Sequence, residues 1–340
     1  MNFLHLVPKS VYDTKMARER MRWMDYVHVQ VAQIGHLVHT TGPGWGDWDE
    51  KNGVGRNIDK CLERQTGEQR AQLVVAYEMG EVKYSPIPTC VIIQEAYDRP
   101  KTLRTIREAD AKLVVFTYAN EVPQYRDELE SEGRAVVTIP HSGDEDLFRD
   151  FGEEKTIDVL IVGSMNQLIY PVRARLARLA WRELRKRGYR VEWLRHPGYT
   201  LPPKSGLVGE AYARKINQSR LVVTCTSRHR YALAKLAEIP LCMSLPISDL
   251  PGERERFFEQ TTLHVDPWRL DREILSSIED VLDDEEDWCR RVKIAHEKVA
   301  ARLTMKDWAE RFVYYARRKI VGEMDMALPK AVDEVDPLLS

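Results

Sequence analysis

The sequence predicts an α/β protein built from two doubly wound domains, with a helical segment at the C-terminus. The chain has 340 residues, which is enough for two domains of ordinary size. Runs such as residues 73–76 and 113–116 are continuously apolar, as expected for parallel strands covered by helices on both faces. Two series of such strands occur, and helical periodicity dominates from Asp271 to about Ile320.

The first series of strands occupies the N-terminal part of the chain. Its expected members are residues 3–7, 72–77, 90–94, 113–118 and 135–139. The polar stretch at residues 141–156 that follows favours a linker or hinge. We therefore place a first domain at residues 1–150 and a second at residues 151–305. A helix is expected at residues 306–322, and residues 323–340 are expected to form a flexible tail.

The second series starts with a strand at residues 157–162, which runs into Gly163 and Ser164. An amphipathic helix is expected next, at residues 171–187, because its leucines recur at helical spacing. Further strands are expected at residues 190–194, 221–225 and 241–245. The second half therefore repeats the architecture of the first.

Composition and charge exclude several classes of protein. Hydrophobic residues make up 43% of the chain and charged residues 31%, which is typical of a folded domain. The formal net charge of −2 gives no overall attraction to nucleic acid. The five cysteines and nine histidines show no metal-binding spacing, so we expect no metal site and a reducing compartment. The N-terminus lacks a signal-peptide pattern and no apolar run spans a bilayer, which predicts a cytoplasmic protein.

Two loops of the second half are suited to binding phosphate. In doubly wound sheets, ligands bind beyond the carboxyl ends of the strands. Gly163 and Ser164 follow one strand there, and the glycine lets a ligand approach the backbone. Thr226 and Ser227 follow another strand and favour the start of a helix with a hydroxyl cap. The simpler interpretation, a tight turn and an ordinary cap, fits each loop equally well.

Residues 230–240 carry the strongest candidate pair. Lys235 and Glu238 are three positions apart, on one side of the expected helix. A lysine supplies positive charge to a diphosphate, and a carboxylate accepts hydrogen bonds from ribose hydroxyls. A surface ion pair explains the same spacing.

These motifs together resemble the group-1 glycosyltransferases, particularly their spore-maturation-type branch. The resemblance covers about residues 135–265. It includes the order strand, Gly163-Ser164, basic helix and strand, then Thr-Ser-Arg-x-Arg-Tyr-x-Leu-Ala-Lys-x-x-Glu-Ile-Pro from Thr226. Residues 139–148 also resemble the Pro-His/Asn-x-x-Asp-x-x-x-Phe junction that opens the second domain of that family.

The resemblance implies a GT-B fold, in which two Rossmann-like domains face a central cleft and the C-terminal helix packs back on the N-terminal domain. Residues 151–305 would then bind the nucleotide sugar, and the first domain would bind the acceptor. Glu238 would bind the donor ribose. The remaining donor-site candidates, several of them around the diphosphate, are Gly163, Ser164, Thr226, Ser227, Arg230, Tyr231 and Lys235. Many relatives have a second glutamate where this chain has Arg230, so the usual two-glutamate arrangement is not expected here.

The N-terminal half supplies candidates for acceptor binding and catalysis. Trp45, Asp47 and Trp48 combine indoles with a carboxylate, residue types that stack on a sugar and bond its hydroxyls. A surface loop is the alternative interpretation. Glu95 and Asp98 follow a predicted strand, so either is a candidate general base. The third catalytic candidate, His141 at the domain junction, is equally well interpreted as a structural hinge.

The sequence thus favours a hexosyl- or pentosyltransferase that uses a nucleotide-diphosphate sugar as co-substrate, without a cofactor or an essential metal. The acceptor is a glycan, a small molecule or modified DNA. A phage-type transferase acting on hydroxymethylated DNA bases is one alternative, and it rests on a basic helical stripe formed by Arg175, Arg178, Arg182 and Arg185. A catalytically inactive nucleotide- or glycan-binding protein is another, suggested by Arg230.

Overall fold

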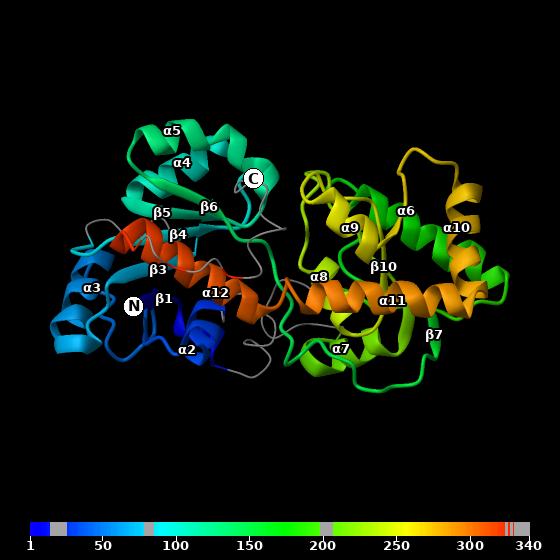
Figure 1. Cartoon of the computed structure of the whole chain (residues 1–340), viewed down its shortest axis with the longest axis horizontal. Coiled ribbons are helices and arrows are strands. Elements are labelled where there is room, and N and C mark those ends of the chain that lie inside the picture. The colour runs from blue at the N-terminus through cyan, green and yellow to red at the C-terminus, as the bar shows by residue number, and fades with distance from the viewer. Residues whose placement is uncertain (14–25, 78–84, 198–206, 324–325, 327–328, 330–340) are drawn as a thin grey trace. The chain divides into compact units, whose positions relative to one another are not determined.

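The computed structural model describes residues 1–13, 26–77, 85–197, 207–323, 326 and 329. It contains two compact units (Figure 1). Unit 1 comprises Met1–Pro140 and the C-terminal segment from Met305, and unit 2 comprises His141–Thr304. Most of the expected tail at residues 323–340 lies outside the described residues.

The boundary between the units falls about ten residues before the predicted one. Residues 141–156, expected to form a flexible linker, instead pack within unit 2. The backbone N–H of Gly143 donates to the Leu303 carbonyl at 2.8 Å. The N–H of Glu153 donates to Oδ1 of Asn217 at 3.1 Å. These hydrogen bonds attach the segment to unit 2, and a hinge over residues 141–156 stays a prediction.

Unit 1 contains a six-stranded sheet whose neighbouring strands are all parallel, in the order β2-β1-β3-β4-β5-β6. The strands are β1 (Phe3–Leu6), β2 (Val38–Thr41), β3 (Leu73–Tyr77), β4 (Thr89–Ile93), β5 (Ala111–Phe116) and β6 (Ala135–Thr138). Strands β3 and β4 are buried at every position, which explains their continuously apolar sequences. β2 was not predicted, because Val38-His39-Thr40-Thr41 at the sheet edge lacks an apolar run.

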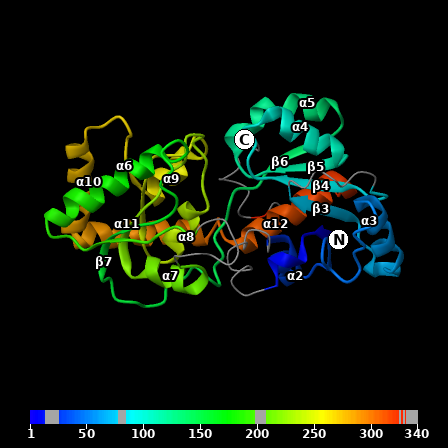
Figure 2. The same cartoon turned by 180° about the vertical axis from the view of Figure 1, so that it is seen from behind.

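Helices cover both faces of this sheet. They are α2 (Val31–Gln33), α3 (Val54–Glu63), α4 (Arg99–Glu108), α5 (Arg126–Ser131) and α12 (Met305–Ala316), with shorter turns at Lys9–Val11, Tyr26–Gln30, Gly67–Gln69, Ala119–Gln124 and Arg317–Val321. Phe312 of α12 packs with Phe3 and Leu73 on one face. Ile58 of α3 and Leu103 of α4 pack on the other. Helix α12 lies in front of the strands in Figure 1 and behind them in Figure 2.

Unit 2 contains a five-stranded parallel sheet in the order β11-β10-β9-β7-β8. Its strands are β7 (Ile157–Ile161), β8 (Val191–Trp193), β9 (Ser219–Val223), β10 (Leu245–Ser248) and β11 (Leu263–His264). Its helices are α6 (Pro171–Leu179), α7 (Gly209–Asn217), α8 (Lys235–Leu241), α9 (Glu255–Thr261), α10 (Asp271–Asp283) and α11 (Glu285–Ala300), and a turn at Ala180–Leu184 extends α6. Leu176 of α6 and Ile278 of α10 pack on the same face of this sheet.

The structure confirms two parallel α/β domains and corrects two elements of the second. Thr226 and Ser227 do not begin a helix, because the chain turns through residues 227–230 and α8 begins only at Lys235. Positive φ angles at Ser227 (65°) and Arg230 (57°) prevent helix there. The strand expected at residues 241–245 starts at Leu245, since Leu241 still belongs to α8.

Candidate functional site

The second sheet has a topological switch point between β7 and β9. The chain moves from β7 outward to β8 on one side and then returns to β9 on the other. Loops that follow strands on the two sides of such a point diverge, and ligands bind in the space at the carboxyl ends. Gly163 follows β7 at this edge, and the turn that leads to α8 follows β9.

Gly163 brings two basic side chains together. Its φ of +88° is in the left-handed region that favours glycine. A Cβ atom at this position would lie 2.7 Å from Nη1 of Arg173 and 3.5 Å from Cε of Lys235. The glycine therefore allows the guanidinium of Arg173 to approach the backbone after β7, with Lys235 alongside.

Arg173 is almost completely buried, with 3% of its surface exposed. Its guanidinium lies over the Tyr170 ring, 4.3 Å from the centroid, and its Nη1 donates to the Ser164 carbonyl at 3.3 Å. Its Nε has no hydrogen-bond partner, and no carboxylate among the described residues forms an ion pair with it. A buried guanidinium without a counter-ion is costly, so this site favours an anion.

Lys235 lies on α8 near this guanidinium at Gly163, and Glu238 follows it three positions later on the same helix. Burial lowers the pKa of Lys235, and Glu238 partly opposes that effect. Burial likewise raises the pKa of Glu238, while Lys235 acts in the opposite direction. Oε2 of Glu238 is buried and has no hydrogen-bond partner. Glu238 forms no ion pair with any other described residue and its oxygen is shielded from water, so the structure does not show the surface ion pair with Lys235 considered from the sequence.

Tyr212 of α7 completes the group. Its ring lies beneath the Lys235 ammonium, at 5.7 Å, and packs edge-on against Phe148. Its hydroxyl is buried without a hydrogen-bond partner. Burial, followed by the negative charge of Glu238, raises the pKa of Tyr212 well above its usual value. The phenol therefore remains protonated and can donate a hydrogen bond.

His141 also belongs to this region. Burial, and secondarily the positive charge of Lys235, lowers its pKa to about 4. The imidazole is therefore neutral near pH 7, and its burial disfavours protonation in the folded protein.

The other predicted donor-site residues lie on the turn between β9 and α8, where several of their polar groups hold the turn. The Thr226 hydroxyl donates to Asp249 at 2.5 Å, and its backbone N–H donates to the same carboxylate at 3.0 Å. Ser227 accepts a hydrogen bond from the His229 N–H at 3.2 Å. Tyr231 is buried with the His229 ring stacked on it.

The Arg230 side chain does not belong to the group around Arg173. It is exposed and forms an ion pair with Glu255 at 2.8 Å. The structure thus groups Gly163, Ser164 and Lys235 around Arg173, with Glu238 on the same helix as Lys235. The Arg230 guanidinium instead pairs with Glu255.

In unit 1, the predicted acceptor residues follow the carboxyl end of β2. The Trp45 indole N–H donates to the Val7 carbonyl at 2.9 Å, and Asp47 accepts from the Thr41 hydroxyl at 3.0 Å. Trp48 packs against the hydrophobic core. These contacts hold the loop in place, and a role in binding an acceptor stays a prediction.

Glu95 and Asp98 are exposed in the loop between β4 and α4. The carboxylate of Asp98 caps this helix, because it accepts a hydrogen bond from the Lys101 N–H at 3.1 Å. The structure therefore gives Asp98 a structural contact, while general-base catalysis by either residue stays a prediction.

Sequence reasoning missed Arg173, Tyr212 and Asp249. Arg173 was hidden among the many arginines of α6, and its burial next to a glycine ten residues earlier depends on tertiary packing. No local sequence feature marked Tyr212, since Lys235 and Glu238 are more than twenty residues away in the chain. The role of Asp249 could not be predicted, because its hydrogen bonds with Thr226 join residues 23 positions apart.

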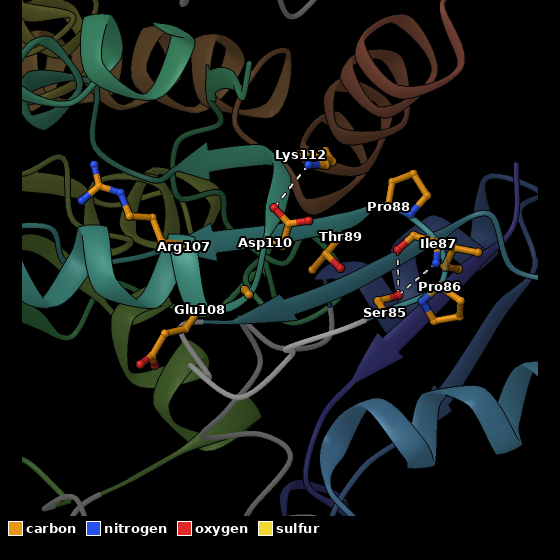
Figure 3. Close-up of a pocket in the computed structure, with 10 residues that line it drawn as sticks. Ser85, Pro86, Ile87, Pro88, Thr89, Arg107, Glu108, Asp110 and Lys112 are labelled. Atoms are coloured by element: carbon orange, nitrogen blue, oxygen red, sulfur yellow. Dashed lines mark hydrogen bonds and ion pairs between the residues drawn. The ribbon is translucent and has the colours of Figure 1, made fainter. Parts of the chain in front are cut away.

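A separate hollow of about 500 Å³ lies in unit 1 (Figure 3). Ser85 and Thr89 line it at the start of β4, and Arg107, Asp110 and Lys112 line it between α4 and β5. Lys112 forms an ion pair with Asp110 at 3.2 Å. The hollow is at the amino ends of the strands, opposite the edge where parallel sheets bind ligands.

Within the described ranges, no group of three or more His, Cys, Asp or Glu side chains is placed to hold a metal ion. No helix in this part of the chain is long and apolar enough to cross a bilayer.

The fold is that of the GT-B glycosyltransferases, with two parallel α/β domains and additional helices. Sucrose-phosphate synthase from Thermosynechococcus elongatus superposes with a TM-score of 0.62 at 12% identity, over 95% of this chain and 100% of that one. An α-glucosyltransferase solved with UDP and a 13-mer DNA containing an HMU base gives 0.57 at 12% identity, over 95% and 100% of the two chains.

A third similar structure is a putative UDP-N-acetylglucosamine 2-epimerase from Listeria monocytogenes. Its TM-score is 0.57 at 10% identity, over 96% of this chain and 99% of that one. No protein-family model and no curated protein sequence matches the chain. At these identities the likenesses establish the fold, and the fold includes both transferases and an epimerase. The spore-maturation-type branch stays a prediction.

Proposed function

We propose that this protein transfers a sugar from a nucleoside-diphosphate donor to an acceptor hydroxyl. The observation that carries the proposal is the buried group at the carboxyl edge of the second sheet. Among the described residues, Arg173 has no carboxylate counter-ion and lies with Lys235 at Gly163, while Oε2 of Glu238 has no hydrogen-bond partner. Two cations suit a diphosphate, and a carboxylate beside them suits the hydroxyls of the attached ribose.

The proposed chemistry follows from this placement. The acceptor oxygen forms a bond to the anomeric carbon of the sugar, and the bond from that carbon to the diphosphate oxygen breaks. The diphosphate leaves with the bonding electrons, and Arg173 and Lys235 stabilise its charge. The acceptor proton passes to a base, for which Glu95, Asp98 and the neutral His141 are the candidates. We propose this stabilisation without an essential metal or cofactor, so activity is expected to persist in EDTA.

Nucleotide binding is the first test of this proposal. We would titrate UDP, GDP, ADP, CDP and their common hexose and pentose conjugates into the protein, using calorimetry and thermal shift. One nucleotide is expected to bind and to raise the melting temperature. Incubation of its sugar conjugate with candidate acceptors should then release the nucleoside diphosphate, detected by phosphorus NMR. Absence of binding by every nucleotide contradicts the proposal.

Two arginines of α6 provide a matched pair of variants. Arg173 is buried at the site, whereas Arg178, five residues later, is exposed. Arg173→Met should weaken diphosphate binding by about 10- to 100-fold, because charge-assisted hydrogen bonds contribute roughly 1.5 to 3 kcal/mol. Arg178→Met should leave binding unchanged. Equal losses in both variants would indicate general electrostatic attraction in place of a defined site.

DNA as the acceptor is a second candidate, supported by the glucosyltransferase solved with DNA. The structure weakens the basic stripe that suggested it, since Arg175 is bound to Asp271 and to two backbone carbonyls. Arg178, Arg182 and Arg185 remain exposed. If DNA is the acceptor, binding should weaken steeply with salt and in the Arg178→Ala/Arg182→Ala double variant. The inactive-protein alternative predicts nucleotide binding without any release of diphosphate.

A further inference from the structure

Two buried polar atoms of unit 2, on helices α7 and α8, have no hydrogen-bond partner among the described residues. Oε2 of Glu238 is an acceptor, and the Tyr212 hydroxyl is a donor, yet neither forms a hydrogen bond. They lie on α7 and α8, which pack against each other, and the ammonium of Lys235, three positions before Glu238, lies 5.7 Å from the centre of the Tyr212 ring. Buried polar groups in folded proteins are nearly always hydrogen-bonded, so this pair lacks a partner that a ligand would supply.

The chemistry of the pair restricts that partner. A carboxylate only accepts hydrogen bonds, and a protonated phenol beside a carboxylate acts as the donor. A group that satisfies both must therefore donate to Glu238 and accept from Tyr212. A hydroxyl does both, whereas a phosphate oxygen only accepts and a C–H group does neither.

We propose that Tyr212 is a specificity-determining residue, which together with Glu238 recognises a ribose hydroxyl of the donor nucleotide and thereby selects ribonucleotides over deoxyribonucleotides. The inference rests on the proposed function, because it assumes a nucleoside diphosphate on Arg173 and Lys235. Lys235 connects the two parts of the site, since its side chain lies at Gly163 and its ammonium lies over the Tyr212 ring. The two cations proposed to bind phosphate, Arg173 and Lys235, are therefore next to the pair proposed to bind the hydroxyl.

The test compares wild type and Tyr212→Phe with three ligands, namely the ribonucleoside diphosphate and its 2′-deoxy and 3′-deoxy forms. Wild type should bind the ribonucleotide at least about tenfold more tightly than one of the deoxy forms, the loss expected when a hydrogen bond to a charged site is removed. Tyr212→Phe should weaken ribonucleotide binding by about tenfold and remove much of that preference. Equal affinity of wild type and variant for all three ligands overturns the inference, as does an equal loss for all three.

Protein stability provides a second readout, because Tyr212→Phe is expected to weaken binding without lowering the melting temperature. A phenol whose hydroxyl is unsatisfied gains nothing from it in the ligand-free protein, so Tyr212→Phe should melt at the wild-type temperature or above. Tyr189 is the matched control, because its hydroxyl donates to Asp283 at 2.8 Å. Tyr189→Phe should lower the melting temperature slightly and leave nucleotide binding unchanged. A Tyr212→Phe variant that melts lower would overturn the inference, and a wild type that binds no nucleotide would instead overturn the proposed function.

Discussion

The carboxyl edges of the two sheets differ in how they use their polar side chains. In unit 1, the groups that the sequence marked as candidates hold the protein together. Trp45 binds the Val7 carbonyl, Asp47 accepts from Thr41 and Asp98 caps a helix. In unit 2, Arg173, Tyr212 and Glu238 each keep a buried polar atom without a partner.

This difference concerns the candidate residues of the two units, since unit 1 also has buried atoms without a partner, such as Oγ1 of Thr138 at the end of β6. Satisfied polar contacts contribute to folding, whereas unsatisfied buried groups cost free energy that the rest of the domain must offset. A site that keeps such groups is arranged for something outside the chain. We therefore predict that variants of these unit 2 residues change ligand binding, whereas variants of the unit 1 candidates change stability.

The largest effect is expected at Gly163. Gly163→Ala places a Cβ 2.7 Å from the Arg173 guanidinium, in a backbone conformation that L-residues rarely adopt. Gly188 has a similar φ, +96°, with no atom near the added Cβ. Both alanine variants should lose about 1 to 2 kcal/mol from backbone strain, measured by urea unfolding. Only Gly163→Ala should also lose nucleotide binding by 100-fold or more, and equal binding by the two variants contradicts the site.

Glu238→Gln should separate binding from stability. The glutamine keeps the shape of the side chain but cannot offer a charged acceptor, so nucleotide affinity should fall by about 10- to 100-fold. Burial raises the pKa of Glu238, so the ionised form is disfavoured in the folded state. Stability is therefore lost as the pH rises from the usual carboxyl pKa through the raised one, and the variant should be at least as stable as wild type at pH 8.

Glu255→Gln provides the control for that prediction, because Glu255 is exposed and paired with Arg230. It should bind nucleotide with wild-type affinity. A Glu238→Gln variant that binds normally, or that is clearly less stable at pH 8, would show that the carboxylate serves the fold and not a ligand.

His141 should produce an acid-dependent loss of stability. Burial and the nearby Lys235 lower its pKa from about 6.5 to about 4. Between these values the unfolded chain binds a proton that the folded protein excludes, so stability decreases as the pH falls through this window. Wild type should lose about 1 to 3 kcal/mol more than His141→Asn between pH 7 and pH 4.5, measured by urea unfolding. Parallel losses in the two proteins would place the imidazole in contact with water.

Asp98 should show the smallest effect, on stability alone. Asparagine caps a helix about as well as aspartate, whereas alanine does not. Asp98→Ala is therefore expected to lose about 1 kcal/mol, and Asp98→Asn should match wild type in thermal unfolding. If Asp98 is the general base, Asp98→Asn should remain stable but transfer sugar at least about 100-fold more slowly. That result would contradict a purely structural role.

Much of the fold could be read from local sequence. The buried strands were found because both of their faces are covered, which makes their sequences continuously apolar. β2 was missed because its edge position tolerates His39 and two threonines. The start of α8 was misplaced because the positive φ angles of Ser227 and Arg230 are imposed by surrounding contacts, including the hydrogen bond from the Gly252 N–H to the Arg230 carbonyl.

The sequence by itself determined the α/β class, the two series of parallel strands and the donor-site candidates Gly163, Lys235 and Glu238, because periodicity and short motifs are local properties. Only the tertiary structure decided that Arg173 and Tyr212 join them and that Arg230 turns to Glu255. Burial and unsatisfied hydrogen bonding depend on which distant segments pack together. That packing is set by the order of the strands in the sheet, which no single stretch of sequence specifies.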